Sequence, residues 1–158
     1  MIESGSSCTL LAEELAASKR DITIITNSAF IAAYIRDASY CQVVLLGGEY
    51  QKNSQVTVGP VTKMDAAYFH VDKLFIGIDG YDIEKGFSGS DLMRAEVVKT
   101  MAQSANHTIV LTDSSKFNRK GLVPILGYEQ IYCVVTDDGI PDNCHNFLQN
   151  HGVRIETV

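Results

Sequence analysis

The chain has 158 residues, of which 46% are hydrophobic and 20% are charged, and this fits one soluble globular domain with a core of its own. Its net charge of −6 argues against a basic surface for binding nucleic acid unaided. No apolar stretch approaches the ~20 residues of a membrane span, and the first residues lack the basic and apolar segments of a signal peptide. We therefore expect a cytoplasmic protein with no membrane partner.

Apolar runs and helical patterns follow one another along the whole chain. Runs such as Ile22–Thr26 are apolar without alternation, which is typical of strands covered on both faces. Strands are expected to end near Ile2 and to lie at 22–26, 42–46, 73–77, 108–112, 130–136 and 153–158. Helices are predicted at 8–19, 29–36, 60–69 and 141–150, and from an N-cap at Asp91 to Ala105. This order predicts an α/β domain with a mostly parallel sheet flanked by helices.

In two segments the apolar residues follow neither the helical nor the strand spacing. Residues 47–58 are expected to form a long loop, a kind of segment that is often functional in compact domains. Gly86, Ser88 and Gly89 are expected to keep the chain loose between the turn at Asp79 and the helix that starts at Asp91.

Two of the predicted helices carry apolar side chains at helical spacing. In the first helix the apolar stripe is formed by Leu10, Leu11, Leu15 and the alanines. In the helix after Asp91 the buried side is expected to consist of Met93, Val97, Val98 and Met101.

The cysteines and histidines give no sign of a metal site. Cys8, Cys41, Cys133 and Cys144 have neither metal-ligand nor redox spacing, and the four histidines show none with them or with one another. We expect reduced thiols, no metal and no cofactor. The chain also lacks a P-loop, a GxGxxG fingerprint and a GxSxG elbow, so the corresponding nucleotide-binding and hydrolase classes are unsupported.

Several strand ends are followed by turns of small, polar or glycine residues. Because the carboxyl ends of parallel strands meet at one edge of a sheet, these turns are expected to lie together. Their backbone N–H groups and hydroxyls, with the positive ends of the following helices, suit a phosphorylated, polyhydroxylated small molecule. The candidate ligand-binding residues are Gly5, Ser6, Ser7, Thr26, Asn27, Ser28, Gly47, Gly48, Asp79, Gly80 and Lys116.

Each candidate also has a structural interpretation. Ser6 and Ser7 could cap the first helix, and Ser28 could cap the second. Gly47-Gly48 could be a tight turn, and Asp79 could bond its own backbone.

The cationic stretch from Asp113 to Lys120 is the most specific of these turns. A lysine after a strand-end turn suits a phosphate, which favours Lys116 as a ligand. Arg119 and Lys120 are better explained as part of a solvated loop.

Taken in this order, the turns resemble the C-terminal effector-sensing domain of DeoR-type bacterial transcriptional repressors. The resemblance covers nearly the whole chain and rests on Glu3-Ser-Gly-Ser-Ser, Thr26-Asn-Ser, Leu46-Gly-Gly, the glycine-bounded Asp79, Asp113-Ser-Ser-Lys-Phe and Val135-Thr-Asp. Glu3 stands where the family usually has Asp. The resemblance implies a fold like that of ribose-5-phosphate isomerase and the coenzyme A transferases, with residues 1–158 as one sensing domain.

The resemblance also implies a function. Such domains bind phosphorylated sugars or sugar alcohols and thereby release the repressor from operator DNA. They act as homo-oligomers, dimers or tetramers, and contact DNA through an N-terminal winged helix-turn-helix that this sequence does not contain. We therefore expect a non-enzymatic sensor that does not bind operator DNA alone.

Two alternatives remain at this point. One is a sugar-phosphate isomerase, for which Asp79 and Asp82 lie near the positions of acid–base carboxylates. The other is a module that serves only oligomerisation.

Overall fold

A single parallel sheet forms the centre of the protein. The structure is a computed structural model that describes residues 1–38 and 40–158. Parallel pairing joins β1 (Ile22–Thr26) to β2 (Cys41–Leu45), and β5 (Val71–Ile76), β8 (Ala105–Leu111), β10 (Cys133–Thr136) and β11 (Arg154–Thr157) to one another in that order. Ile2 bridges both Thr26 and Phe75 in parallel, so the first residues join these two groups of strands. The α/β fold with a parallel sheet flanked by helices is confirmed.

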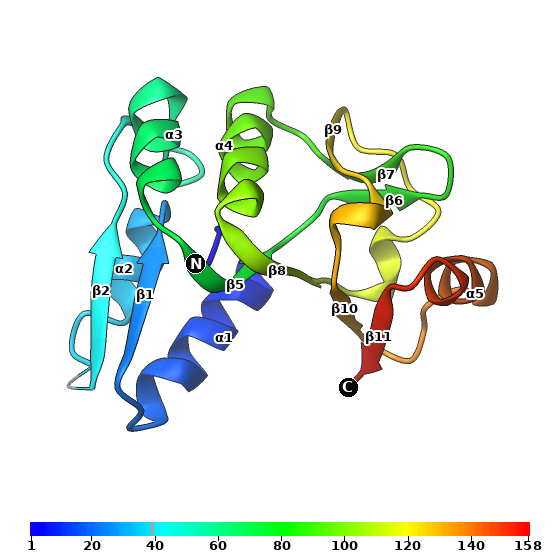
Figure 1. Ribbon diagram of the computed structural model, residues 1–158, viewed down its shortest axis with the longest axis horizontal. Coiled ribbons are helices and arrows are strands. Elements are labelled where there is room, and N and C mark those ends of the chain that lie inside the picture. Colours follow the sequence, from blue (N-terminus) through cyan, green and yellow to red (C-terminus); the bar gives the residue numbers. More distant parts are fainter. Residues whose placement is uncertain (39) are drawn as a thin grey trace.

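Helices cover both faces of this sheet. The helices are α1 (Ser6–Ala17), α2 (Ala29–Tyr34), α3 (Gly59–Tyr68), α4 (Leu92–Gln103) and α5 (Asp142–Asn150). Neighbouring residues of β1 point to opposite faces, and they belong to different cores: Ile24 packs in the core formed with α1 and α2, and Ile25 in the larger core formed with α3, α4 and α5. Figure 1 shows α3 and α4 side by side, with α5 at the opposite end near β11. No helix of the described residues is long and apolar enough to cross a membrane.

Five short strands lie outside the central sheet. β3 (Glu49–Gln51) and β4 (Val56–Val58) form an antiparallel hairpin. β6 (Gly80–Asp82), β7 (Gly86–Gly89) and β9 (Val123–Leu126) form an antiparallel three-stranded sheet. The predictions of a long loop at 47–58 and of loose chain before Asp91 are therefore wrong. Strands of three or four residues are too short to show a period, and cross-strand pairing holds them.

The other elements agree with the sequence within a few residues, but some side chains do not. Val97, Val98 and Met101 are buried on α4 as expected, whereas Met93 is 39% exposed. Leu10 was expected in the apolar stripe of α1 and is 63% exposed. Leu10 is exposed because it lies two residues from both Cys8 and Ala12, the buried residues of α1, and therefore on the opposite face of the helix.

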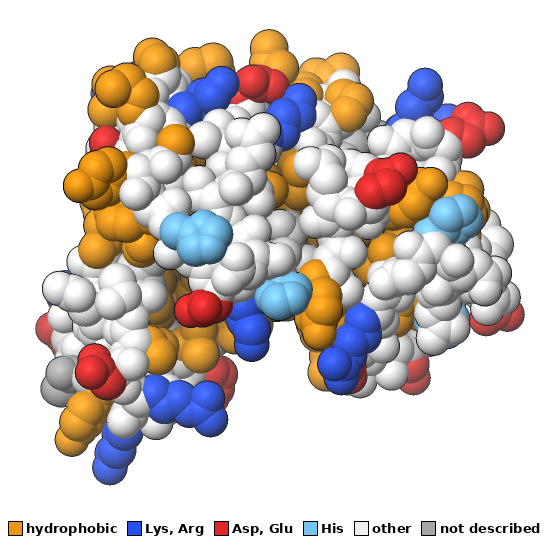
Figure 2. All heavy atoms as spheres, viewed as in Figure 1, with side chains coloured by type: hydrophobic (Ala, Val, Ile, Leu, Met, Phe, Trp, Pro, Cys, Tyr) orange, Lys and Arg blue, Asp and Glu red, His pale blue; other side chains and the backbone are white. Residues whose placement is uncertain are grey.

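Large apolar side chains also remain exposed on α3 and β2. Figure 2 shows hydrophobic side chains gathered on that side of the molecule. They include Leu45, Val61, Met64 and Tyr68. The four cysteines are free thiols, as the sequence predicts.

Gly48 shows how tightly the turn after β2 packs against α3. Its φ of +131° suits glycine, and an added Cβ would lie 2.7 Å from the Val58 carbonyl oxygen and in overlap with the Thr62 hydroxyl. Thr62 cannot move away without losing the 2.6 Å hydrogen bond that its hydroxyl donates to the Gly47 carbonyl oxygen.

We predict that Gly48→Ala destabilises the domain more than Gly152→Ala does. Gly152 also has a positive φ, of +83°, but an added Cβ there meets nothing within 4 Å. Both variants introduce backbone strain, and only the first adds overlap, which typically costs about 1–3 kcal/mol. Urea unfolding of both variants measures the difference, and equal free energies of unfolding would contradict the predicted overlap.

Candidate functional site

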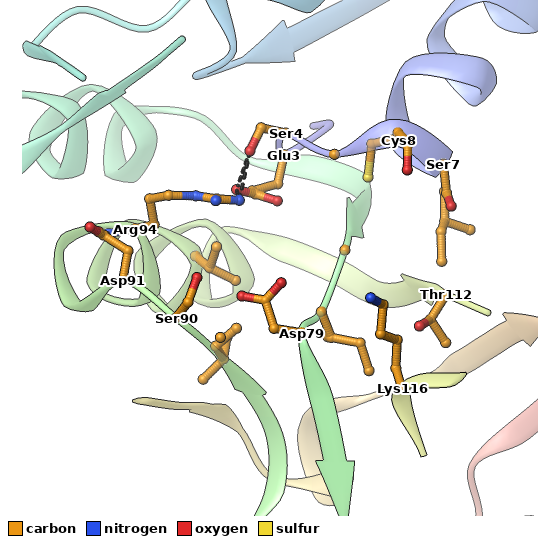
Figure 3. A pocket seen from close by; sticks show the side chains of 18 of the residues that line it. Glu3, Ser4, Ser7, Cys8, Asp79, Ser90, Asp91, Arg94, Thr112 and Lys116 are labelled. Carbon is orange, nitrogen blue, oxygen red and sulfur yellow. Dashed lines mark hydrogen bonds and ion pairs between the residues drawn. The ribbon is translucent and has the colours of Figure 1, made fainter. Parts of the chain in front are cut away.

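An open hollow of about 220 Å³ lies at the carboxyl edge of the parallel sheet. It is lined by the turn that follows Ile2, the turn after β5, the start of α4 and the turn after β8 (Figure 3). Ile125 of β9 adds part of the wall. Five of the predicted site residues line this hollow: Gly5, Ser6, Ser7, Asp79 and Lys116. The ends of two adjacent central strands meet here, as in other open α/β sheets.

The start of α1 faces this hollow without a cap. Gly5 is the N-cap residue, with φ +133°, and no side chain bonds the N–H groups of the first turn. The first helical bond is donated by Thr9 N–H to the Gly5 carbonyl oxygen. The N–H groups of Ser6, Ser7 and Cys8 therefore have no partner within the helix. An uncapped helix start that is open to a hollow can accept an anion.

Lys116 brings a cation to the same hollow. It is the last residue of a short 3-10 helix, Ser114–Lys116, in the turn after β8. Figure 3 shows its side chain turned into the hollow. None of the ion pairs in the described part of the chain includes Lys116. Its charge is therefore available to a ligand.

Two carboxylates hold the turn that carries Lys116. Asp113 accepts hydrogen bonds from the hydroxyl and the backbone N–H of Ser115, and these bonds lower the pKa of its carboxyl group. Asp137 accepts a 2.7 Å bond from the Ser114 N–H, and hydrogen bonding by Ser114 likewise lowers the pKa of Asp137. Both carboxylates are thus kept ionised and engaged, and they orient the turn.

Asp79 supplies a carboxylate on the other side of the hollow. Its backbone N–H donates a 2.9 Å bond to the Ser88 carbonyl oxygen, which fixes the turn, while its side chain is exposed to the hollow (Figure 3). Asp79 is in none of the ion pairs of residues 1–38 and 40–158. A free carboxylate can accept hydrogen bonds from ligand hydroxyls.

Glu3 and Arg94 form a buried ion pair in the wall. The Glu3 side chain is 2% exposed, and its Oε1 accepts a 2.8 Å bond from Arg94 Nη2. The same Nη2 donates to Ser4 Oγ at 2.7 Å, and Ser4 Oγ donates to Glu3 Oε1 at 2.8 Å. Burial lowers the pKa of Arg94, but the charge and hydrogen bond of Glu3, together with the charges of Asp79 and Asp91, outweigh burial and raise that pKa. The triad ties the first turn to α4.

The segment 26–28 lies outside the central hollow. The side chains of Thr26, Asn27 and Ser28 are 0%, 0% and 1% exposed. Thr26 Oγ1 accepts from the Ser28 N–H, Asn27 Nδ2 donates to the Thr57 carbonyl oxygen, and Ser28 Oγ caps α2. Ser28 does touch a second, more open hollow, which is also lined by Gly5 and Ser6. These residues have structural roles, and their ligand role stays a prediction.

The predicted glycines at 47, 48 and 80 also lie away from the central hollow. Gly47 donates its N–H to Asp65 Oδ2 at 2.9 Å, and Gly48 packs against α3. Gly80 is in β6, where an added Cβ would lie 2.9 Å from the Gly121 backbone nitrogen. At these positions glycine permits close packing of the chain against itself.

Several residues that line the hollow could not be predicted from the sequence. Arg94, Ser90 and Thr112 line the hollow, and none of them belongs to a recognisable motif. One signal was present: Glu3 follows a buried strand, and a buried carboxylate requires a cationic or hydrogen-bonding partner. Which cation it pairs with depends on the tertiary structure.

Among the described residues, neither the Cys8 thiol nor a cluster of metal-ligating side chains supplies a reactive group. Burial raises the pKa of the Cys8 thiol far above its ordinary value, so the thiol stays neutral and is a poor nucleophile. Among the described residues, no group of three or more His, Cys, Asp and Glu side chains could hold a metal ion.

Several known regulators of transcription are similar to this chain in sequence. A protein of Escherichia coli O157:H7 named as an aga operon transcriptional repressor is 30% identical over all 158 residues, which cover 58% of its own length. The regulator IolR of Bacillus subtilis (strain 168) is 24% identical over 98% of this chain and 61% of its own. The L-fucose operon activator of Haemophilus influenzae is 23% identical over 83% of this chain and 53% of its own. The chain thus spans little more than half the length of these relatives.

The family is shown by the match of a family model. Residues 1–138 match the model described as the DeoR C terminal sensor domain. The relatives are named as regulators of transcription, which agrees with the expectation of a sensor rather than an enzyme. The chain therefore belongs to the DeoR family of transcriptional regulators, in which it corresponds to the C-terminal sensor domain.

Proposed function

We propose that this sensor domain binds a phosphorylated sugar or sugar alcohol in the central hollow, and that binding releases a repressor from operator DNA. DNA contact would be made by a DNA-binding segment outside this sequence. The observation that carries the proposal is the uncapped start of α1, which shares one hollow with the unpaired cation of Lys116.

The charges of the hollow support a phosphate at the α1 end. Four carboxylates line it against two cations, Arg94 and Lys116. Arg94 is paired with Glu3, and the other carboxylates except Asp79 serve as helix caps. This leaves Lys116 and the backbone N–H groups of α1 as the groups that can balance a dianion, because the positive end of the helix dipole adds to the lysine charge.

The remaining groups suit the hydroxyls of a sugar. Asp79 can accept two or more hydrogen bonds, and the Ser90 hydroxyl can both donate and accept. The Thr112 hydroxyl, which donates to the Asp113 carbonyl oxygen at 3.3 Å, can accept. The side chain of Asp91 is engaged, since it accepts from the Arg94 N–H at 2.7 Å and so caps α4. A ligand with an anionic end and a polyol end therefore matches the polarity of the hollow.

Release from DNA requires that the ligand favour one of two arrangements of the regulator. Such coupling is typically ~1–3 kcal/mol. Because DNA-binding dimers contact paired half-sites, we propose that the regulator acts as a homo-oligomer, a dimer or a tetramer. The sheet β6–β7–β9 and the turn carrying Lys116 border the hollow and could carry the change outward, since Ile125 of β9 lines it.

We predict that Lys116→Ala weakens binding of a sugar phosphate by roughly 10- to 150-fold. The loss of one charge-assisted hydrogen bond costs about 1.5–3 kcal/mol of binding free energy. Lys120→Ala is the matched control, because Lys120 is 61% exposed, pairs with Asp82 at 3.6 Å and lies outside the hollow. Calorimetry with a panel of sugar phosphates makes the measurement. Equal affinities for both variants, with unchanged melting temperatures, would remove Lys116 from the site.

We predict that Ser6→Pro weakens binding about tenfold more than Ser6→Ala. Proline is tolerated at the first helical position and removes one backbone N–H, whereas alanine removes only the hydroxyl. The difference between the variants therefore reports a backbone bond to the phosphate, at about 1.5 kcal/mol.

The non-phosphorylated sugar serves as the internal control for this pair. It should bind weakly to the unsubstituted protein and should not distinguish Ser6→Pro from Ser6→Ala. Equal affinity of the unsubstituted protein for the sugar and its phosphate would show that the start of α1 is only a structural turn.

A further inference from the structure

The two outer strands of the parallel sheet differ in how they are protected. β11 carries Arg154 and Glu156, which pair with each other on the strand. β2, Cys41–Leu45, carries no charged residue and no proline. Proteins usually protect exposed edge strands with charges, prolines or covering segments, because unpaired strands associate. β11 therefore carries charges that protect it, whereas β2 carries neither a charge nor a proline.

The outer side of β2 presents backbone groups for pairing. In the described part of the chain, β2 pairs with β1 alone. The Leu46 N–H donates to the Thr26 carbonyl oxygen at 2.9 Å, so the backbone N–H and C=O groups of Leu46 point toward β1. Because successive residues of a strand alternate, the N–H groups of Val43 and Leu45 point away from β1. They have the orientation needed to bond another strand.

An apolar stripe on α3 continues this edge. Val61, Met64 and Tyr68 lie on one face of the helix by their spacing and are 52%, 72% and 88% exposed. The stripe is joined to the end of β2 through Gly47: a Cβ at Gly47 would lie 3.8 Å from Val61 Cγ1. Together with Leu45, which is 46% exposed, these residues form one surface, which we name the β2–α3 face. It lies on the side where Figure 2 shows hydrophobic side chains gathered.

We propose that the β2–α3 face binds a second copy of this chain, with the two β2 strands pairing antiparallel about a twofold axis. This deepens the proposed function, which calls for at least a dimer, and it names the surface that makes it. Two identical strands can pair in this way because an interface on a twofold axis matches a surface with itself.

The distribution of charge favours a second copy as the occupant. β2 brings no charge to the axis, and the carboxylate of Asp65, on the same side of α3, is engaged by the Gly47 N–H at 2.9 Å. No like charges would therefore meet across the axis at these positions.

The test is the mass of the 158-residue protein in solution, measured by analytical ultracentrifugation over a range of concentrations. We expect at least a dimer of the 17.3 kDa chain. The double variant Leu45→Lys/Met64→Lys brings two cations from each copy into this apolar face, and its dimer dissociation constant should rise at least 100-fold. The matched control is Leu10→Lys/Leu122→Lys, at leucines that are 63% and 83% exposed elsewhere. The control should keep the mass of the unsubstituted protein.

Hydrogen exchange adds a measurement that is specific to strand pairing. The amides of Val43 and Leu45 should be protected in the unsubstituted protein and should exchange faster in the Leu45→Lys/Met64→Lys variant. A monomer at every concentration, an oligomer that tolerates both lysines, or an oligomer lost equally in the control would overturn the proposal.

Ligand binding is measured separately on the same variants. The shift in melting temperature with sugar phosphates should persist in the double variant, because both substitutions lie outside the hollow. Loss of the dimer as expected, with no sugar-phosphate response in any variant, would leave this interface standing and overturn the proposed function.

Discussion

The site depends on the insertion of the first three residues between β1 and β5. The Ile2 N–H donates to the Ile25 carbonyl oxygen and the Glu3 N–H to the Phe75 carbonyl oxygen, each at 2.9 Å. This short strand closes the gap in the sheet and directs the next turn to the middle of its carboxyl edge. It also buries Glu3, and the Arg94 side chain compensates that charge. A buried carboxylate without its partner costs about 3–5 kcal/mol, so the pair ties the first turn to α4.

Helix capping then sets the polarity of the hollow. α2 and α4 are capped by Ser28 and Asp91, whose side chains satisfy first-turn N–H groups. α1 starts at Gly5, which has no side chain with which to do so. The positive end of α1 is thus left for a ligand, while the start of α4, which also lines the hollow, is neutralised by its own aspartate. Lys116 and Asp79, the unpaired charges described above, extend this polarity across the hollow.

The parts of the fold that could be predicted are those encoded by long apolar runs. The central strands and the five helices follow from such runs and from caps such as Asp91, whose side chain accepts from Arg94 N–H as expected. The hairpin β3–β4 and the sheet β6–β7–β9 could not be predicted, because their strands have three or four residues and are held by distant partners. In the site, sequence order predicted that turns gather at one edge. It could not predict that Thr26-Asn27-Ser28 would be buried or that Arg94 would reach Glu3, since both depend on packing between distant segments.

The most direct test of the central claim is an NMR titration of backbone amides with sugar phosphates. The account predicts that the amides of Ser6, Ser7 and Cys8 shift on binding, together with that of Lys116. The amides of Asn27 and Gly48 should stay in place, because they lie outside the hollow. A ligand that shifts Asn27 and Gly48 and leaves the start of α1 unchanged would contradict it.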